Sequence, residues 1–152
     1  MPKIMVIYHS QQFGNTKKMA EQVAEGCRQV PGVEVKLVNV NEARVDMAEL
    51  AACDGLALGS PDYFSYVAGG IKQFFDDAWI ARRAGQPTGD KPAVAFMSHG
   101  GGGRAITALE KLMQSLKYEP VAPSVTCQRE PTGDAVAACQ ALGRALAERV
   151  TR

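Results

Sequence analysis

The segment Ser10–Thr16 combines hydroxyl groups, side-chain amides and a glycine between an apolar run and a helical pattern. The first backbone N–H groups of a helix have no partner within it, and the helix dipole is positive at that end. Ser10, Asn15 and Thr16 add side-chain donors, and Gly14 lets the backbone approach a ligand closely. This chemistry suits a phosphate group. An ordinary strand-to-helix turn with Asn15 or Thr16 as the N-cap is the alternative, and an NTPase P-loop is excluded because no Gly-Lys-Ser/Thr occurs.

A second polar segment, Ser60–Tyr66, contains the aromatic residues Tyr63, Phe64 and Tyr66. Loops rarely expose large apolar side chains, and an aromatic face can stack on a planar ring system. We therefore expect Tyr63 or Phe64 to contact a planar ligand, unless that side chain folds back onto the core.

A third segment, Ser98–Arg104, places four consecutive glycines ahead of another helical pattern. Flexible backbone N–H donors at a helix start suit a polar or anionic ligand. His99 and Arg104 are the candidate charged groups beside that ligand, although a solvated Arg104 is an equal alternative. The sequence therefore predicts that this segment shares a binding site with the first two.

Two other motifs overlap the glycine-rich segment. His-Gly-Gly-Gly also occurs in esterase oxyanion loops, but the chain has no Gly-x-Ser-x-Gly nucleophile motif. Gly100-x-Gly102-x-x-Ala105, with Glu119 further along, is similar to a dinucleotide fingerprint. Such a fingerprint normally follows the first strand of its unit, and only one weak strand follows here, which disfavours this alternative.

Apolar runs alternate with helical patterns along the chain, and several runs are continuously apolar, as in strands buried on both faces of a parallel sheet. The runs are Ile4–Tyr8, Val33–Val40, Gly55–Gly59, Ala93–Met97 and, weakly, Pro120–Cys127. One of the apolar helix stripes contains Val67, Ile71, Phe74, Phe75, Ala78 and Trp79, and the helix within Val45–Ala52 is the weakest. The alternation predicts an α/β fold with a doubly wound sheet, whose ligands bind beyond the carboxyl ends of the strands.

The composition limits the class of protein. With 152 residues, of which 46% are hydrophobic, the chain can bury one sizeable core, and we expect a single domain over residues 1–152. The net charge of +1 gives no reason to expect nucleic acid or a membrane as partner. No signal-peptide or membrane-spanning pattern is evident, so we expect a cytoplasmic protein. The four cysteines form no metal or redox motif and are expected to be buried thiols: Cys27, Cys53, Cys127 and Cys139.

Ser-x-x-x-Gly-Asn-Thr after the first strand resembles the FMN phosphate loop of the flavodoxin-like family. Gly59-Ser60-Pro61-x-Tyr63 and the glycine-rich segment are similar to the flavin loops of its NAD(P)H:quinone oxidoreductase and FMN reductase branch, in particular the tryptophan-repressor-binding-protein type. The resemblance implies a flavodoxin-like three-layer sandwich, with a five-stranded parallel sheet of order 2-1-3-4-5 and helices on both faces. It also implies FMN as the cofactor, bound by Ser10, Gln11, Gln12, Phe13, Gly14, Asn15, Thr16, Pro61, Asp62, Tyr63, Phe64, Ser98, His99, Gly100, Gly101, Gly102 and Gly103.

The same resemblance implies a redox function. We expect NAD(P)H-dependent reduction of a quinone or similar small acceptor, with His99 and Arg104 as catalytic groups, because cations beside the flavin would stabilise its reduced, anionic form. A flavodoxin-type carrier that shuttles electrons between protein partners, and a flavin-binding module without turnover, are the alternatives. Electron-shuttle flavodoxins are strongly acidic, whereas this chain is near neutral. The insertion that helps the quinone oxidoreductases to form tetramers is not evident, so the question of a homo-oligomer stays open.

Overall fold

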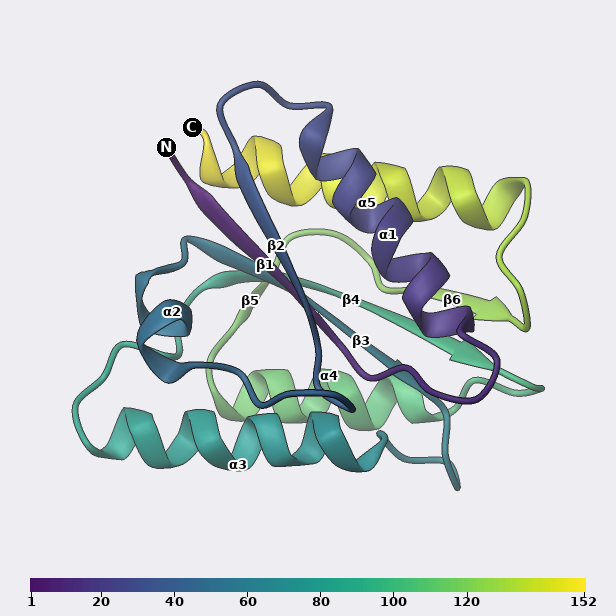
Figure 1. The fold of residues 1–152 in the computed structure, drawn as a ribbon, viewed down its shortest axis with the longest axis horizontal. Coiled ribbons are helices and arrows are strands. Elements are labelled where there is room, and N and C mark those ends of the chain that lie inside the picture. Colours follow the sequence, from purple (N-terminus) through teal and green to yellow (C-terminus); the bar gives the residue numbers. More distant parts are fainter.

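The apolar runs predicted as strands form one parallel sheet in the computed structural model, which describes residues 1–152 (Figure 1). The strands are β1 (Lys3–Tyr8), β2 (Glu34–Asn39), β3 (Gly55–Pro61), β4 (Pro92–His99), β5 (Glu119–Pro120) and β6 (Val125–Gln128). Their order is β2-β1-β3-β4, and both β5 and β6 pair with β4. The predicted order 2-1-3-4-5 is confirmed, with the fifth position divided between two short strands.

Proline explains the division of the fifth strand. The predicted run contains Pro120 and Pro123, which have no backbone N–H to donate to a ladder. The pairing with β4 accordingly breaks after Pro120 and resumes at Val125. Gln128 at the end of β6 pairs with His99 at the end of β4, so the loop that follows β6 also reaches the carboxyl edge of the sheet.

Helices cover both faces of the sheet, as predicted. On one face lie α1 (Asn15–Arg28) and α5 (Asp134–Val150), and on the other lie α2 (Met47–Ala52), α3 (Gly69–Arg83) and α4 (Ala105–Ser115) (Figure 1). Successive residues of β1 point to opposite faces, so that Ile4 and Val6 pack in the core under α1 and α5, whereas Met5 and Ile7 pack in the other core. The three-layer sandwich is therefore confirmed. None of its helices has the length and apolar character that crossing a bilayer requires.

Two glycines allow α1 and α5 to pack in direct backbone contact. A Cβ on Gly26 would lie 2.0 Å from the carbonyl oxygen of Gln140, and a Cβ on Gly143 would lie 1.9 Å from that of Val23. Larger residues at either position would force the helices apart. This close packing fixes α1 against the sheet, and with it the loop at the start of α1.

The buried positions agree with the sequence pattern except at one residue of α3. All four cysteines are free and buried, as predicted. Trp79, however, is 46% exposed, so its assignment to the core stripe of α3 is wrong. At 100° per residue Trp79 lies about 80° around the helix from Ile71, at the margin of the buried face.

Candidate functional site

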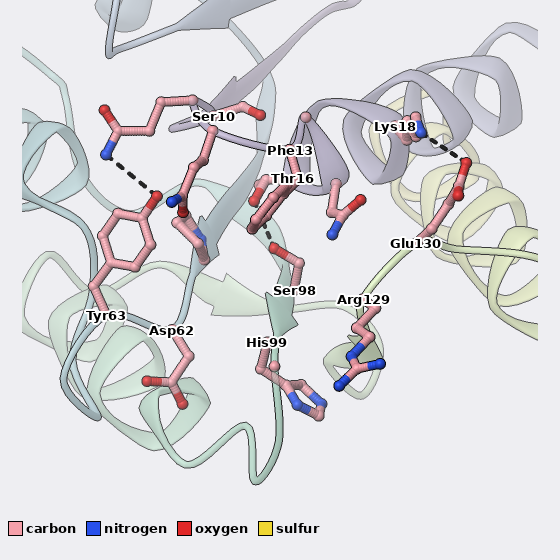
Figure 2. Close-up of a pocket in the computed structure, with 16 residues that line it drawn as sticks. Ser10, Phe13, Thr16, Lys18, Asp62, Tyr63, Ser98, His99, Arg129 and Glu130 are labelled. Carbon is pink, nitrogen blue, oxygen red and sulfur yellow. Dashed lines mark hydrogen bonds and ion pairs between the residues drawn. The ribbon is translucent and has the colours of Figure 1, made fainter.

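The loops after β1, β3, β4 and β6 surround a cavity of about 710 Å³ at the carboxyl end of the sheet (Figure 2). The register explains why these loops meet: Tyr8 pairs with Gly59, and Pro61 pairs with Ser98, so neighbouring strands end at similar heights. Cavities of this size hold cofactors and other small molecules. The lining residues are Ser10, Gln11, Gln12, Phe13, Gly14, Asn15, Thr16, Lys18, Pro61, Asp62, Tyr63, Ser98, His99, Gly100, Arg129 and Glu130.

The start of α1 directs helix-terminal donors toward this cavity. The N-cap position is Gly14, which has φ 72° and no side chain to bond the first turn. The alternative with Asn15 or Thr16 as N-cap is therefore wrong. Because the first N–H groups of a helix have no carbonyl partner within it, the backbone at Asn15 and Thr16 can donate to an anion in the cavity.

Three hydroxyl groups add further donors to the same end of the cavity. The Ser10 hydroxyl accepts a hydrogen bond from the Lys17 N–H at 3.2 Å, which leaves its own proton for a ligand. The hydroxyl oxygens of Thr16 and Ser98 lie 2.7 Å apart, and both residues are buried. Only one of these two hydroxyls donates within the pair, so the other proton is also available. This part of the cavity has the donors that a phosphate group needs.

A tight turn after β3 separates the two candidate aromatic residues. Tyr63 and Tyr66 exchange backbone hydrogen bonds of 3.0 Å, and the residues between them, Phe64 and Ser65, have φ 57° and 60°. The Phe64 side chain is completely exposed and lies outside the cavity lining, whereas Tyr63 lines the cavity. Gln11 donates a hydrogen bond of 3.2 Å to the Tyr63 hydroxyl (Figure 2). The structure thus presents Tyr63, and not Phe64, to a ligand in the cavity.

His9 packs against the Tyr63 ring but is not one of the residues that line the cavity. The two rings meet edge to face, with centroids 6.1 Å apart. His9 is 5% exposed, and its Nδ1 accepts a hydrogen bond of 3.2 Å from the Gly70 N–H. Burial lowers the pKa of His9, and its Nε2 is buried without a partner. A neutral His9 that holds the Tyr63 turn in place is consistent with these contacts.

Asp62 occupies part of the helix start that the glycine-rich segment was expected to offer. One carboxylate oxygen accepts from the Ser65 N–H at 2.9 Å, and the other accepts from the Ala105 N–H at 3.3 Å. Since Ala105 begins α4, the carboxylate lies at the positive end of that helix. The Asp62 carboxylate thereby occupies the Ala105 N–H, a donor at the start of α4 that a ligand could otherwise bind.

The loop after β6 contributes charged residues that the sequence reasoning did not include. Lys18 Nζ and Glu130 Oε1 lie 2.7 Å apart across one end of the cavity, and this hydrogen bond lowers the pKa of Glu130 (Figure 2). Arg129 forms no ion pair, so it is the one cation of the lining without a carboxylate partner. Its N–H donates to the His99 carbonyl at 2.8 Å, and its φ of 61° is uncommon for a residue with a side chain. Such strained positions are frequent at functional sites.

Several predicted residues lie beside the main cavity and not in it. Gly101, Gly102 and Arg104 line an adjoining hollow of about 460 Å³, which shares Asp62 with the main cavity. Gly103 is buried against His99, where an added Cβ would lie 2.8 Å from the imidazole ring. His99 lines the main cavity, and its Nδ1 is buried without a partner.

The dinucleotide alternative for the glycine-rich segment is wrong. Glu119 pairs in register with Pro92 at the opposite end of β4 from the glycines, and its carboxylate binds Arg149 at 2.9 Å. An eight-residue strand spans roughly 26 Å, so Glu119 cannot share a ligand with Gly100 or Gly102.

The residues of the main cavity fit FMN. An anion site of backbone and hydroxyl donors lies at one end, and the Tyr63 ring provides an aromatic wall. The buried, unpartnered Nδ1 of His99 is a polar group that a bound molecule could satisfy.

Comparisons with known proteins agree with this geometry. The family described as NADPH-dependent FMN reductase matches residues 46–128. A flavodoxin of Aquifex aeolicus is 38% identical over 165 aligned residues, covering 97% of this chain and 86% of that protein. The quinone oxidoreductase QR2 of Triphysaria versicolor is 31% identical, covering 74% of this chain and 63% of that protein. Among solved structures, a flavodoxin from the domain Archaea is 27% identical and superimposes over 99% of both chains with a TM-score of 0.86.

Proposed function

Because the chain belongs to the flavodoxin-like FMN reductase family and is an FMN-binding redox protein, we propose that it reduces a quinone or similar small acceptor with electrons from NAD(P)H. The bound FMN would supply the redox chemistry, since a flavin can accept a hydride and pass electrons on. The protein supplies binding, orientation and charge.

The two ends of the cavity would have separate roles in binding. Ser10 and the Thr16–Ser98 pair would donate hydrogen bonds to the FMN phosphate, together with the first N–H groups of α1. Tyr63 would pack on the ring system, held by the hydrogen bond from Gln11. Both sets of contacts come from loops anchored on strand ends, which favours a precise position for the ligand.

The observation that carries the enzymatic proposal is the unpaired guanidinium of Arg129 in the cavity lining. Glu130 is neutralised by Lys18, and Asp62 is bonded to backbone N–H groups, so no carboxylate compensates Arg129. A cation at this place stabilises negative charge that develops in the cavity. Two-electron reduction generates such charge, and it is the chemistry that NAD(P)H oxidation requires. Arg104, in the adjoining hollow, is a second and more remote cation.

An electron carrier that docks on other proteins is the second candidate. Phe13 is 76% exposed although it belongs to the cavity lining, and an exposed aromatic side chain at the rim suits contact with a protein. The 38% identity to a flavodoxin also supports this candidate.

Anaerobic stopped-flow mixing of the FMN-loaded protein with NADH and, separately, with NADPH tests the proposal. We expect the flavin absorbance to bleach at a rate that saturates with one nicotinamide, and to slow when the transferred hydrogen of that nicotinamide is deuterium. A subsequent mix with a quinone should restore the absorbance. An FMN-loaded protein that neither nicotinamide reduces, but that a reduced ferredoxin-type protein reduces readily, would instead be a carrier.

A further inference from the structure

His9 provides a hydrogen-bond acceptor that the start of α3 lacks. The N-cap residue of α3 is Ala68, whose methyl group cannot bond the first turn. The Gly70 N–H instead donates to His9 Nδ1 at 3.2 Å. A Cβ on Gly70 would lie 2.6 Å from this nitrogen, so a glycine is needed for the helix backbone to come this close to the imidazole. The side chain of His9, at the end of β1, therefore caps α3.

The same imidazole lies against the aromatic wall of the cavity. Its centroid is 6.1 Å from that of the Tyr63 ring, and the two planes meet at 82°. The backbone of His9 is fixed as well, because its N–H donates to the Gly59 carbonyl at 3.1 Å. His9 is 5% exposed. It therefore joins the end of β1, the start of α3 and the Tyr63 turn at one buried point.

These contacts require the neutral form of the imidazole. Because Nδ1 accepts from the Gly70 N–H, the neutral ring carries its proton on Nε2, which is buried without a partner. A second proton would have to bind Nδ1, where it would face the Gly70 N–H, a donor opposite a donor. It would also place positive charge at the positive end of the α3 dipole. Protonation of His9 is thus incompatible with its contact to α3.

The surroundings of His9 offer no group that would compensate such a charge. The titratable side chains on the surrounding elements are Glu42 after β2, Asp62 and Tyr63 after β3, and Lys72 in the first turn of α3. None of them hydrogen-bonds to His9 or forms an ion pair with it, and burial alone lowers the pKa of His9. A protonated His9 therefore has to leave this position.

We propose that His9 is a positioning residue through which pH controls flavin binding: in mild acid the protonated imidazole leaves the start of α3, the Tyr63 turn loses its support, and the ring end of the cavity binds FMN less tightly. The bound flavin in turn favours the neutral imidazole, because such coupling is reciprocal. Flavin affinity should be constant above pH 6.5 and fall at lower pH, since the pKa of His9 is below 6.5 in the free protein and lower still in the complex. This inference concerns flavin binding and does not depend on the reaction with NAD(P)H.

Riboflavin is the probe that isolates this effect, because the phosphate of FMN itself titrates near about pH 6. Quenching of flavin fluorescence gives the dissociation constant of the riboflavin complex between about pH 5 and 8, wherever the free protein stays folded. For the wild type the constant should rise in acid by up to about tenfold for each pH unit, the limit for one linked proton.

Two variants assign the pH dependence to a residue. His9→Gln keeps an acceptor for the Gly70 N–H but cannot be charged, so its profile should be flat. His99→Gln, at the other histidine of the chain, is the matched control and should keep the pH slope of the wild type even if its affinity is lower. Equal slopes in the wild type and His9→Gln would overturn the proposal. So would a slope that disappears in His99→Gln.

A measurement on the wild type does not depend on whether the variants fold. NMR titration of the imidazole signals, assigned through the backbone, gives the pKa of each histidine with and without riboflavin. The pKa of His9 should be lower in the complex than in the free protein. An equal pKa of His9 in the two states would mean that flavin binding and protonation are independent, and the proposal would be wrong.

Discussion

The side-chain amide of Asn39 is bonded to both backbone polar groups of Ser10. Its Oδ1 accepts a hydrogen bond from the Ser10 N–H at 3.0 Å, and its Nδ2 donates one to the Ser10 carbonyl at 3.0 Å. Asn39 ends β2, and Ser10 lies in the loop that leads from β1 to α1. The pair therefore fixes the path of the loop that we assign to the phosphate of FMN, from a strand that does not itself touch the cavity.

Replacing Asn39 with Ala should lower both stability and FMN affinity. Ser10 is 7% exposed, so its N–H and carbonyl would lose their partners in a buried place, at a cost of about 1–3 kcal/mol in the free energy of unfolding. Chemical denaturation measures the stability, and calorimetric titration with FMN measures the affinity. Asn41→Ala is the control, because only the backbone N–H of Asn41 bonds to Asn39. Equal losses in the two variants would contradict a special role for Asn39.

Replacing Thr16 with Val should weaken the binding of FMN but not of riboflavin, which lacks the phosphate. The variant keeps the volume of the side chain and removes a hydroxyl of the buried Thr16–Ser98 pair, and a hydrogen bond to a charged group is worth about 1.5–3 kcal/mol. Titration of flavin fluorescence with each ligand gives the two affinities. If both affinities fall by the same factor, Thr16 acts through the structure of the loop and not through the phosphate.

Tyr63→Ala and Phe64→Ala should have different effects, although the two residues are adjacent. Tyr63 lines the cavity, and an aromatic ring stacked on the flavin contributes about 0.5–1.5 kcal/mol beyond its buried area and quenches flavin fluorescence. Phe64 is completely exposed, so its loss should leave affinity and quenching unchanged. The two alanine variants serve as controls for each other. A larger effect at Phe64 would show that the turn rearranges when FMN binds.

Burial of His9 should make the protein less stable in mild acid. Its pKa is lowered from the ordinary value of 6.5, so the unfolded chain binds a proton more readily than the folded one. Stability should therefore be greatest above pH 6.5 and fall as the pH drops through that value toward the lowered pKa of the folded protein. Urea midpoints measured across this range should show a steeper decline for the wild type than for His9→Gln. Identical pH profiles would mean that His9 has the same pKa in the folded and the unfolded protein.

The sequence was sufficient to predict those site residues whose role depends on their type and on their position close after the end of a strand. Ser10, Thr16 and Tyr63 were predicted as neighbours because the carboxyl ends of parallel strands share one edge, and the structure places them in one cavity. Asn39 could not be found in this way, because its role depends on the pairing of β2 with β1, where it lies opposite Tyr8.

The sequence analysis did not find Arg129 as a residue of the cavity and wrongly assigned Trp79 to the core, and the physical reasons differ from the one for Asn39. Arg129 follows a strand that two prolines interrupt, so the sequence pattern did not show that its loop reaches the cavity. Trp79 has the spacing of a core residue but lies at the margin of its helix stripe, where packing in three dimensions decides whether a side chain is covered.

The last prediction concerns the two arginines near the cavity, because they separate the enzyme from the carrier. Two-electron reduction of bound FMN adds negative charge to the flavin, and a cation in the cavity lining stabilises that charge. Arg129→Gln should therefore lower the two-electron reduction potential of the bound FMN by on the order of 30 mV, which corresponds to about 1.4 kcal/mol, and should slow its reduction by NAD(P)H. Arg104→Gln, in the adjoining hollow, is the matched control and should lower the potential less. Equilibration with redox dyes gives the potentials, and anaerobic mixing gives the rates.

If Arg104→Gln has the larger effect, the charge that faces the flavin belongs to the glycine-rich loop and not to the loop after β6. If Arg129→Gln lowers the potential while the wild type reacts with neither nicotinamide, the cation tunes an electron carrier and the enzymatic proposal is wrong.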